Sequence, residues 1–235
     1  RRPPISTLFP YTTLFRSIKY SVENKLQEKI RLLNAIVILS GFLGSALFEL
    51  IFQNKVLSVN NLFTIGLTFY GGLILSAFAI ALYSLILKLN IFYLFNFYAL
   101  PLTVGHVIGR LGCFFAGCCF GAPTNCWIGI RFPIDSVPHM HYQEIIQIHP
   151  TQLYESFGLL IIFSILHFAD INKRLAIYLL SYSTLRFIIE FFRSDPRGSI
   201  MDFNLLSPAQ IISLVLFIVG LIIMQKNMSS KETGL

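Results

Sequence analysis

Six apolar runs, each about 20 residues long, are the feature that most constrains this sequence. They cover residues 32–52, 62–87, 91–112, 150–168, 174–193 and 208–225. A helix of about 20 apolar residues crosses the hydrocarbon core of a bilayer, and the runs lack the alternation of polar and apolar residues that is typical of a membrane β-barrel. We therefore predict an all-α fold, a polytopic helical membrane bundle with about six transmembrane helices.

The composition agrees with this interpretation. Of the 235 residues, 55% are hydrophobic and 12% are charged, whereas a soluble domain carries about 25% charged residues. The six runs leave no stretch long enough for a separate soluble domain. We expect a single transmembrane domain over residues 18–235.

The first seventeen residues, "RRPPISTLFPYTTLFRS", do not fit that domain. They contain an imperfect repeat, TLFP and then TLFR, match no helix or strand pattern, and lack a signal-peptide cleavage pattern. The stretch resembles translated sequencing-adaptor DNA. We expect residues 1–17 to be an artefactual leader and the native N-terminus to be missing.

The net charge of +7 is explained better by membrane topology than by a nucleic-acid partner. Nine basic residues fall on one side of the six spans: Lys19, Lys25, Lys29, Arg31, Lys88, Lys173, Arg174, Lys226 and Lys231. The other side holds fewer: Lys55, Arg131, Arg193, Arg197 and Arg110 near its span end. The positive-inside rule then predicts that both termini are cytoplasmic and that the connection 113–149 faces outward.

Arg110 lies late in the third span among glycines that include Gly109 and Gly112. An arginine inside a membrane marks a functional site by default, and its planar guanidinium suits bidentate binding of phosphate. The alternative is that the side chain snorkels to the outer interface.

A second polar cluster, "HPTQLYE", opens the fourth span. Gln152 and Glu155 are three residues apart on one helical face, with Tyr154 beside Glu155 and Pro150 in the first turn. We expect Glu155 to point into the bundle about one turn from the outer surface.

A third cluster lies in the fifth span. Tyr182, Arg186, Glu190 and Arg193 are spaced by four, four and three residues, which predicts that all four line one helical face. Arg186 and Glu190 can form an ion pair, and a purely structural salt bridge would explain that pair alone. Three spans thus aim charged groups at the outer half of one bundle, where the simplest ligand is a phospholipid with an anionic head.

The second span carries Tyr70 followed by Gly71 and Gly72. Paired glycines admit a close neighbour, either a lipid or another helix, and the Tyr70 hydroxyl can reach a ligand. Helix packing explains the glycines equally well.

These motifs carry a family resemblance. "GRLG", "HPTQLYE", "YSTLRFIIEFFR" followed by "DP", and "TFYGGL" resemble, in the same order over about residues 35–225, the motifs of the prolipoprotein diacylglyceryl transferases. That family consists of seven-span bacterial inner-membrane enzymes with a site open to the periplasm. They move diacylglycerol from phosphatidylglycerol to the lipobox cysteine thiol of prolipoproteins. The resemblance implies a transferase whose partners are phosphatidylglycerol and the lipobox of the prolipoprotein signal peptide, with no cofactor, metal or nucleic acid.

The resemblance also implies roles for residues. Arg110 matches the family's headgroup arginine, Arg186 the second essential arginine and Tyr182 the tyrosine four residues before it. The residues expected to be catalytic are Arg110, Arg186, Glu155, Tyr182, Tyr70 and Cys118. Those expected to bind substrate are Gly71, Gly72, Gly109, Gly112, Cys113, His149, Gln152, Tyr154, Glu190 and Arg193.

Two departures concern the proton that the acceptor thiol must lose. Tyr70 stands where the family has histidine, and a tyrosine, with an ordinary pKa of about 10, is a poor base. "GRLGCFFAGCCFG" stands where the family reads GRLGNFINGELWG, so Cys113 replaces an asparagine and Cys118 a glutamate.

The four cysteines, Cys113, Cys118, Cys119 and Cys126, do not have the spacing of a regular zinc motif. The sequence leaves four explanations open: buried unreactive thiols, a disulfide in the outward loop, a catalytic or redox thiol, and a metal site shared with His139, His141 or His149.

The leading hypothesis is transfer of a diacylglyceryl group from an anionic phospholipid to a thiol. The competing hypothesis is a non-enzymatic or redox membrane protein that retains the lipid-binding scaffold. A transporter is a third possibility, although the sequence has no inverted repeat to favour it.

Overall fold

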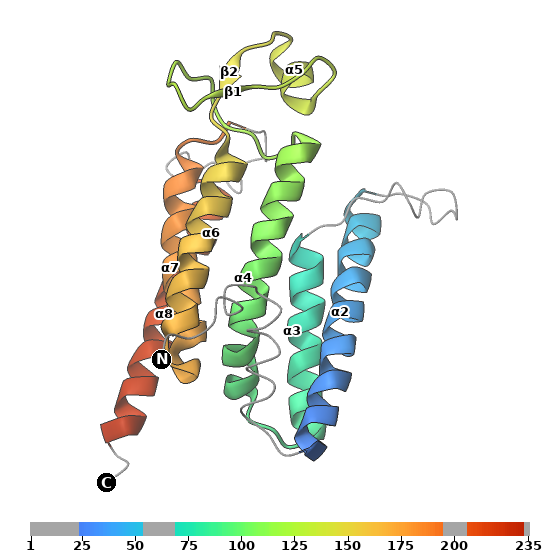
Figure 1. The fold of residues 1–235 in the computed structure, drawn as a ribbon, viewed down its shortest axis with the longest axis vertical. Helices are drawn as coiled ribbons and strands as arrows, with labels where there is room; N and C mark the ends of the chain where they lie inside the picture. The colour runs from blue at the N-terminus through green and yellow to red at the C-terminus, as the bar shows by residue number, and fades with distance from the viewer. Residues whose placement is uncertain (1–23, 54–68, 195–205, 233–235) are drawn as a thin grey trace, which may run out of the picture. The chain divides into compact units, whose positions relative to one another are not determined.

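The computed structural model describes residues 24–53, 69–194 and 206–232 (Figure 1). The chain divides into two compact units, one ending at Leu94 and one beginning at Phe95. Each unit is treated separately below. The leader expected over residues 1–17 lies outside the described residues.

Six helices correspond to the six predicted spans. They are α2 (Asn24–Gln53), α3 (Phe69–Ile86), α4 (Ile91–Ala116), α6 (Thr151–Phe168), α7 (Arg174–Glu190) and α8 (Pro208–Glu232). Helices α2, α4, α6 and α8 are long and apolar enough to cross a membrane, and α3 is apolar but shorter over its described part. The prediction of an all-α, multi-pass membrane bundle is confirmed.

Glycines bring the backbones of α2 and α3 together in the first unit. A Cβ added at Gly71 would overlap the carbonyl oxygen of Gly44, and one added at Gly72 would lie 2.8 Å from the carbonyl oxygen of Gly41. Small residues allow this close approach of membrane helices. The structure therefore bears out the helix-packing explanation for the Gly71–Gly72 pair, and the predicted role of these glycines in substrate binding stays a prediction.

The second unit has a core formed by α4, α6 and α7. Its fully or nearly buried members are Ala99, Leu100, Val107, Leu159, Ile162, Leu166 and Tyr178. Two of the helices meet closely, because a Cβ at Gly158 of α6 would lie only 2.5 Å from side-chain atoms of Leu185 in α7. This packing fixes the helices that carry the polar clusters.

A folded connection joins the end of α4 to the start of α6. It lies beyond one end of the helices of the second unit (Figure 1). It contains a short antiparallel pair, β1 (Ile130–Arg131) and β2 (Gln147–Ile148), with Ile130 opposite Ile148. It also contains the short helix α5 (Val137–Tyr142). The connection begins after Ala116 rather than at residue 113 as expected, because α4 continues through Cys113.

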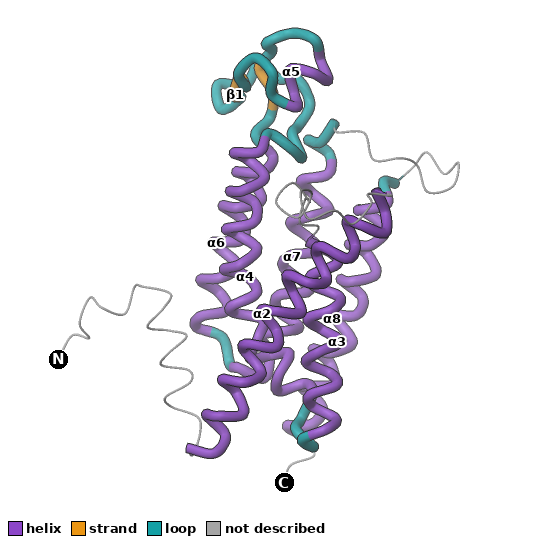
Figure 2. Tube along the Cα trace, turned by 90° about the vertical axis from the view of Figure 1, so that its right-hand side faces the viewer, coloured by secondary structure: helices purple, strands orange, loops and turns teal. Residues whose placement is uncertain are grey.

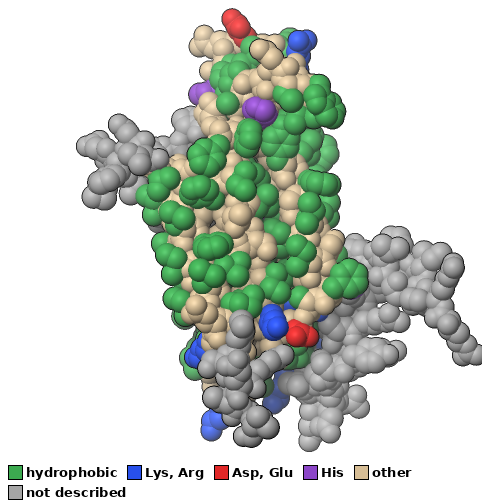
Figure 3. Space-filling model, turned by 90° about the vertical axis from the view of Figure 1, so that its left-hand side faces the viewer, with side chains coloured by type: hydrophobic (Ala, Val, Ile, Leu, Met, Phe, Trp, Pro, Cys, Tyr) green, Lys and Arg blue, Asp and Glu red, His purple; other side chains and the backbone are tan. Residues whose placement is uncertain are grey.

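Large apolar side chains cover the outward faces of α6 and α8. Phe157, Leu160, Ile161 and Ile165 of α6 are all about half exposed or more, and α8 presents a similar series that includes Val215 and Ile222. Figure 3 shows hydrophobic side chains over most of one face, with the charged groups near its ends. This is the surface that a lipid bilayer requires.

The helices of the second unit alternate in direction, as the colour run of Figure 1 shows, and Figure 2 shows β1 and α5 together beyond one end of α6. The short 3₁₀ turn η3 (Ile171–Lys173) joins α6 to α7 at the end opposite the β1–β2 connection. The ends of α4 and α7 and the starts of α6 and α8 therefore lie together. The charged clusters of the sequence all map to this end.

Candidate functional site

Glu155, in the second turn of α6, is fully buried and forms the centre of the site. One carboxylate oxygen, Oε1, lies 2.9 Å from Arg110 Nη2 and accepts a hydrogen bond of 3.0 Å from the Tyr182 hydroxyl. Arg110 belongs to α4 and Tyr182 to α7, so three helices meet at one carboxylate. The expectation that Glu155 points into the bundle is confirmed.

His106 joins this centre from one turn before Arg110. Its Nε2 lies 3.8 Å from Glu155 Oε1, which is too long for a hydrogen bond, and the two form an ion pair only when the imidazole is protonated. Its Nδ1 is 3.2 Å from the Tyr178 hydroxyl, and its ring meets the Tyr182 ring edge-on with centroids 4.7 Å apart. The charges of Arg110 and Arg186 both act on this imidazole.

Sequence analysis assigned no role to His106 or Tyr178. A signal was present: each stands four residues before a residue that was selected, His106 before Arg110 and Tyr178 before Tyr182. Residues spaced by four share a helical face. The Tyr178 and Tyr182 rings stack, with centroids 5.7 Å apart.

Arg186 forms the second charged centre, in α7. Its Nη2 lies 2.6 Å from Glu190 Oε2, and both side chains are buried, so the ion pair expected from their spacing is present. The other nitrogen, Arg186 Nη1, is buried without a hydrogen-bond partner among the described residues. A buried guanidinium with an unused donor is costly unless a ligand or water completes it.

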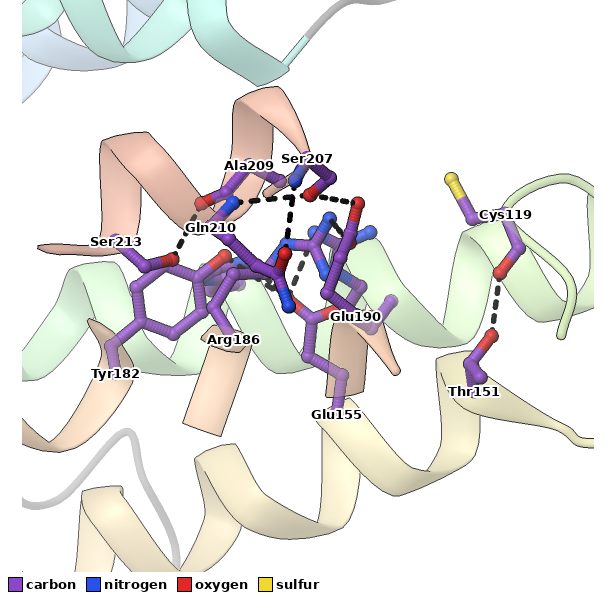
Figure 4. A network of polar contacts seen from close by, with 12 residues as sticks. Cys119, Thr151, Glu155, Tyr182, Arg186, Glu190, Ser207, Ala209, Gln210 and Ser213 are labelled. Atoms are coloured by element: carbon purple, nitrogen blue, oxygen red, sulfur yellow. Dashed lines mark hydrogen bonds and ion pairs between the residues drawn. The ribbon is translucent and has the colours of Figure 1, made fainter. Parts of the chain in front are cut away.

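The start of α8 supports this second centre, which Figure 4 shows together with Glu155. The Ser207 hydroxyl donates a 2.8 Å hydrogen bond to Glu190 Oε1. The Gln210 side-chain oxygen accepts from the Ser207 backbone N–H, and the Gln210 backbone N–H donates to the Ser207 hydroxyl oxygen. Sequence analysis missed Ser207 and Gln210 because a Ser-Pro-x-Gln start is an ordinary helix beginning.

The predicted position of Arg193 on the α7 face is wrong. The helix ends at Glu190, and the next three N–H groups, of Phe191, Phe192 and Arg193, bond three residues back in tight turns. Arg193 instead pairs its backbone with Gly121 in an isolated β-bridge. The helix stops because residues 191–193 are tied to the connection that follows α4.

The remaining residues of "HPTQLYE" tie that connection to α6. The Gln152 side chain donates to the Cys118 carbonyl at 2.6 Å, and the Thr151 hydroxyl donates to the Cys119 carbonyl at 2.7 Å. His149 Nδ1 lies 3.0 Å from the Tyr154 hydroxyl. Pro150 caps α6 rather than lying inside its first turn. These hydrogen bonds hold the connection that follows α4 against the start of α6, and the side chains of Thr151 and Gln152 are both buried.

Three of the four cysteines lie close together at the end of α4 and in the turn that follows it. The sulfur atoms of Cys113, Cys118 and Cys119 all lie within 4.8 Å of one another, and this is the group of side chains with the geometry to hold a metal ion among the described residues. Hydrogen bonds donated by the other two thiols lower the pKa of Cys119, and the nearby guanidinium groups of Arg193 and Arg110 lower it further. Hydrogen bonds with Cys113 and Cys119 raise the pKa of Cys118.

For three other expected residues the structure gives only the helix in which each lies or the space around it. Tyr70 is in the first turn of α3, in the first unit, and its side chain lies outside the described residues. A Cβ added at Gly109 or Gly112 would meet no described heavy atom within 4 Å. A catalytic role of Tyr70 and a substrate-binding role of Gly109 and Gly112 stay predictions.

The arrangement combines a buried guanidinium group, that of Arg186, which has an unused donor, a partly exposed one, that of Arg110, and a histidine between a carboxylate and a tyrosine hydroxyl. Guanidinium groups in a water-poor site stabilise the negative charge of a bound or departing phosphate. A neutral imidazole beside a carboxylate can accept a proton, because the carboxylate offsets part of the cost of forming an imidazolium in a buried site near two arginines. The site thus suits displacement of a phosphate leaving group by a nucleophile that loses a proton.

Comparison with known proteins agrees with this chemistry. Residues 5–226 match the family described as prolipoprotein diacylglyceryl transferase. The chain is similar to phosphatidylglycerol–prolipoprotein diacylglyceryl transferase 2 of Clostridium perfringens, with 35% identity over 220 residues, 88% of this chain and 83% of the relative. The transferase of Clostridium tetani is 32% identical over 71% of this chain and 66% of its own length. That of Francisella tularensis subsp. novicida is 32% identical over 84% and 75%.

Proposed function

Because the chain belongs to the prolipoprotein diacylglyceryl transferase family, we propose that it transfers a diacylglyceryl group from phosphatidylglycerol to the lipobox cysteine thiol of a lipoprotein precursor. One observation carries the proposal: two arginines from different helices, Arg110 and Arg186, lie with the buried carboxylate Glu155 in one polar network inside a membrane bundle. An intramembrane cluster of this kind is expensive to maintain without a polar ligand.

The phosphate of the lipid headgroup is bound by the two arginines. Arg186 offers Nη1, which has no hydrogen-bond partner among the described residues. Arg110 keeps 14% of its side chain exposed, so a ligand can reach it while it remains paired with Glu155. The acyl chains of the lipid remain in the bilayer against apolar helix faces.

The transfer is a displacement at the glycerol carbon that bears the phosphate ester. The thiolate sulfur forms a bond to this carbon, the carbon–oxygen bond breaks, and glycerol phosphate leaves with the electron pair. Arg110 and Arg186 stabilise the charge that develops on the leaving phosphate. The thioether product keeps both acyl chains.

The thiol proton goes to His106. A thiol must ionise before it attacks, and Tyr70, at the position where the family has histidine, is a poor base. The carboxylate of Glu155, 3.8 Å from His106 Nε2, supports the protonated form of His106 against its burial and the charges of Arg110 and Arg186. His106 acts as the general base in this chain.

The protein lies in the bacterial inner membrane with the site facing outward. Lys173, Arg174 and Lys226 lie at the ends of α6, α7 and α8 that are remote from Glu155 and its partners. Basic residues remain on the cytoplasmic side. The lipobox of the precursor therefore reaches the site from the outer half of the membrane.

The test is lipidation by the native full-length protein that contains this sequence. Cells depleted of their own diacylglyceryl transferase would express it together with a reporter prolipoprotein, and mass spectrometry would follow the added mass. We expect lipidation by the native protein and by Arg131→Ala, which removes an exposed arginine of β1, and loss of lipidation in Arg186→Ala. A membrane-inserted native protein that leaves the reporter unmodified would refute the proposal.

A further inference from the structure

The transfer steps proposed above assign no task to the three thiols that converge beside the site, and the predicted roles of Cys118 in catalysis and of Cys113 in substrate binding stay predictions. Cys113 lies near the end of α4, and Cys118 and Cys119 lie in the turn that follows. Their sulfur atoms are all within 4.8 Å of one another, and all three side chains are only partly exposed. We call these three residues the thiol cluster.

The end of α4 folds the chain back to build this cluster. Gly117 adopts a φ of 69° and Cys119 a φ of 60°, both in the left-handed region. The Cys118 backbone N–H donates a 3.1 Å hydrogen bond to the Cys113 carbonyl, which closes the turn over the last residues of the helix. A left-handed conformation is unfavourable for a residue with a side chain, so the surroundings must hold Cys119 there.

Helix α6 supplies that support. Gln152 and Thr151, in its first turn, donate hydrogen bonds of 2.6 and 2.7 Å to the carbonyls of Cys118 and Cys119. Both donors are buried. The backbone that carries two of the thiols is therefore fixed before any ligand arrives, which lowers the entropic cost of binding.

We propose that Cys113, Cys118 and Cys119 bind a thiophilic metal ion, Zn²⁺ or Cu⁺, through their three sulfur atoms. Sulfur ligands at about 2.3 Å from a tetrahedral zinc lie about 3.8 Å apart, so the observed cluster needs only a small contraction. Soft thiolates select these two ions over harder cations. Each thiol that becomes a ligand releases its proton to solvent.

The charges around the cluster fit an anionic metal–thiolate group. Three thiolates and one Zn²⁺ carry a net charge of −1, and with Cu⁺ the charge is −2. The guanidinium groups of Arg193 and Arg110 act on Cys119 and supply up to two positive charges. The fourth coordination position is left to water, because the histidines of the connection do not belong to the group.

The experiment measures metal binding directly and does not depend on transferase activity. The full chain would be purified in detergent with its thiols reduced, then titrated with Cd²⁺ as a spectroscopic probe of thiolate ligation. Competition against chelators would give the affinity for Zn²⁺ and for Cu⁺ in separate arms. We expect one equivalent of Cd²⁺ to bind. Its thiolate-to-metal charge-transfer absorption should have the intensity of three thiolate ligands, and the bound ion should protect three thiols from alkylation.

Matched serine substitutions locate the site. Cys118→Ser and Cys119→Ser should weaken metal affinity more than about 100-fold, since loss of even a supporting contact costs 10–100-fold. Cys126→Ser removes the fourth cysteine, which lies outside the cluster, and should leave affinity unchanged. If a cluster variant does not fold, the absorption intensity of the bound Cd²⁺ and the protection of thiols from alkylation in the unaltered protein still show whether three thiolates bind the metal.

Three results would overturn the proposal. The reduced protein would bind no metal stoichiometrically, Cys118→Ser would bind as tightly as the unaltered chain, or protein alkylated at once on isolation without reductant would contain a disulfide within the cluster. None of these results bears on whether prolipoprotein is lipidated, so failure here is distinct from failure of the proposed function.

Discussion

The Arg110 guanidinium and the Glu155 carboxylate lie 2.9 Å apart, and Glu155 is fully buried. Removal of one member of a buried ion pair leaves the other charge without compensation, which costs about 3–5 kcal/mol. We therefore expect Glu155→Gln to lower the free energy of unfolding by that amount, measured by chemical denaturation in detergent. Glu144→Gln, at an exposed glutamate of the outer connection, is the control and should change stability by less than about 0.5 kcal/mol.

The same pair provides a second check through a double-mutant cycle. Replacement of both members by apolar residues, Arg110→Met with Glu155→Leu, should destabilise the fold less than Glu155→Leu alone, because no unpaired charge remains. Destabilisation by the double variant equal to the sum of the effects of Arg110→Met and Glu155→Leu would mean that the two side chains do not interact in the membrane.

Activity should depend on the planar guanidinium of Arg186 and not only on its positive charge. Arg186→Lys keeps the charge but loses the fork that binds phosphate through two nitrogens. We expect kcat/KM for phosphatidylglycerol to fall about 100- to 1000-fold, the loss typical of one donor to a developing anion. Transfer rates at varied phosphatidylglycerol in mixed micelles would measure it, and full activity of the lysine variant would contradict the assigned role.

The hydroxyls of two stacked tyrosines should differ in importance. Tyr182 donates to the carboxylate of Glu155, whereas the Tyr178 hydroxyl contacts the neutral ring of His106. Hydrogen bonds to charged groups contribute about 1.5–3 kcal/mol and neutral ones about 0.5–1.5. We expect Tyr182→Phe to be more destabilising than Tyr178→Phe in thermal unfolding, and the reverse order would argue against the Glu155-centred network.

His106 should determine how the rate depends on pH. His106→Asn removes the base, so kcat should fall by about 100- to 10,000-fold while the KM for phosphatidylglycerol changes little. The acceptor thiol, with an ordinary pKa of about 8.5, ionises by itself as pH rises. The rate of the variant should therefore climb about tenfold per pH unit below that value, and a flat pH profile would exclude a base role for His106.

The sequence predicted the helices well because membrane spans depend on one strong signal, apolar length. It placed Tyr182, Arg186 and Glu190 together because they follow one helical period within α7. It could not predict that Glu155 pairs with Arg110, since that contact depends on the packing of α6 against other helices. The end of α7 was misplaced because the tie between Arg193 and Gly121 is a contact distant in sequence.

The thiol cluster also depends on contacts that the sequence pattern does not predict. C-x₄-C-C has no regular metal spacing, and the sequence left a metal site, a disulfide and inert thiols all open. Convergence of the three sulfurs requires left-handed backbone at Gly117 and Cys119, together with support from Gln152. These are tertiary features, and a spacing pattern does not contain them.

Gly71 of the first unit should matter more for stability than Gly109 of α4. A Cβ at Gly71 would overlap the Gly44 carbonyl, so Gly71→Ala should force α2 and α3 apart and lower the unfolding temperature by several degrees. Gly109→Ala adds a Cβ that meets no described atom within 4 Å and should stabilise α4 by up to about 1 kcal/mol, the ordinary helix-propensity gain. Thermal unfolding of both variants in the same detergent measures the contrast. Equal effects would mean that the α2–α3 contact is not close in the membrane.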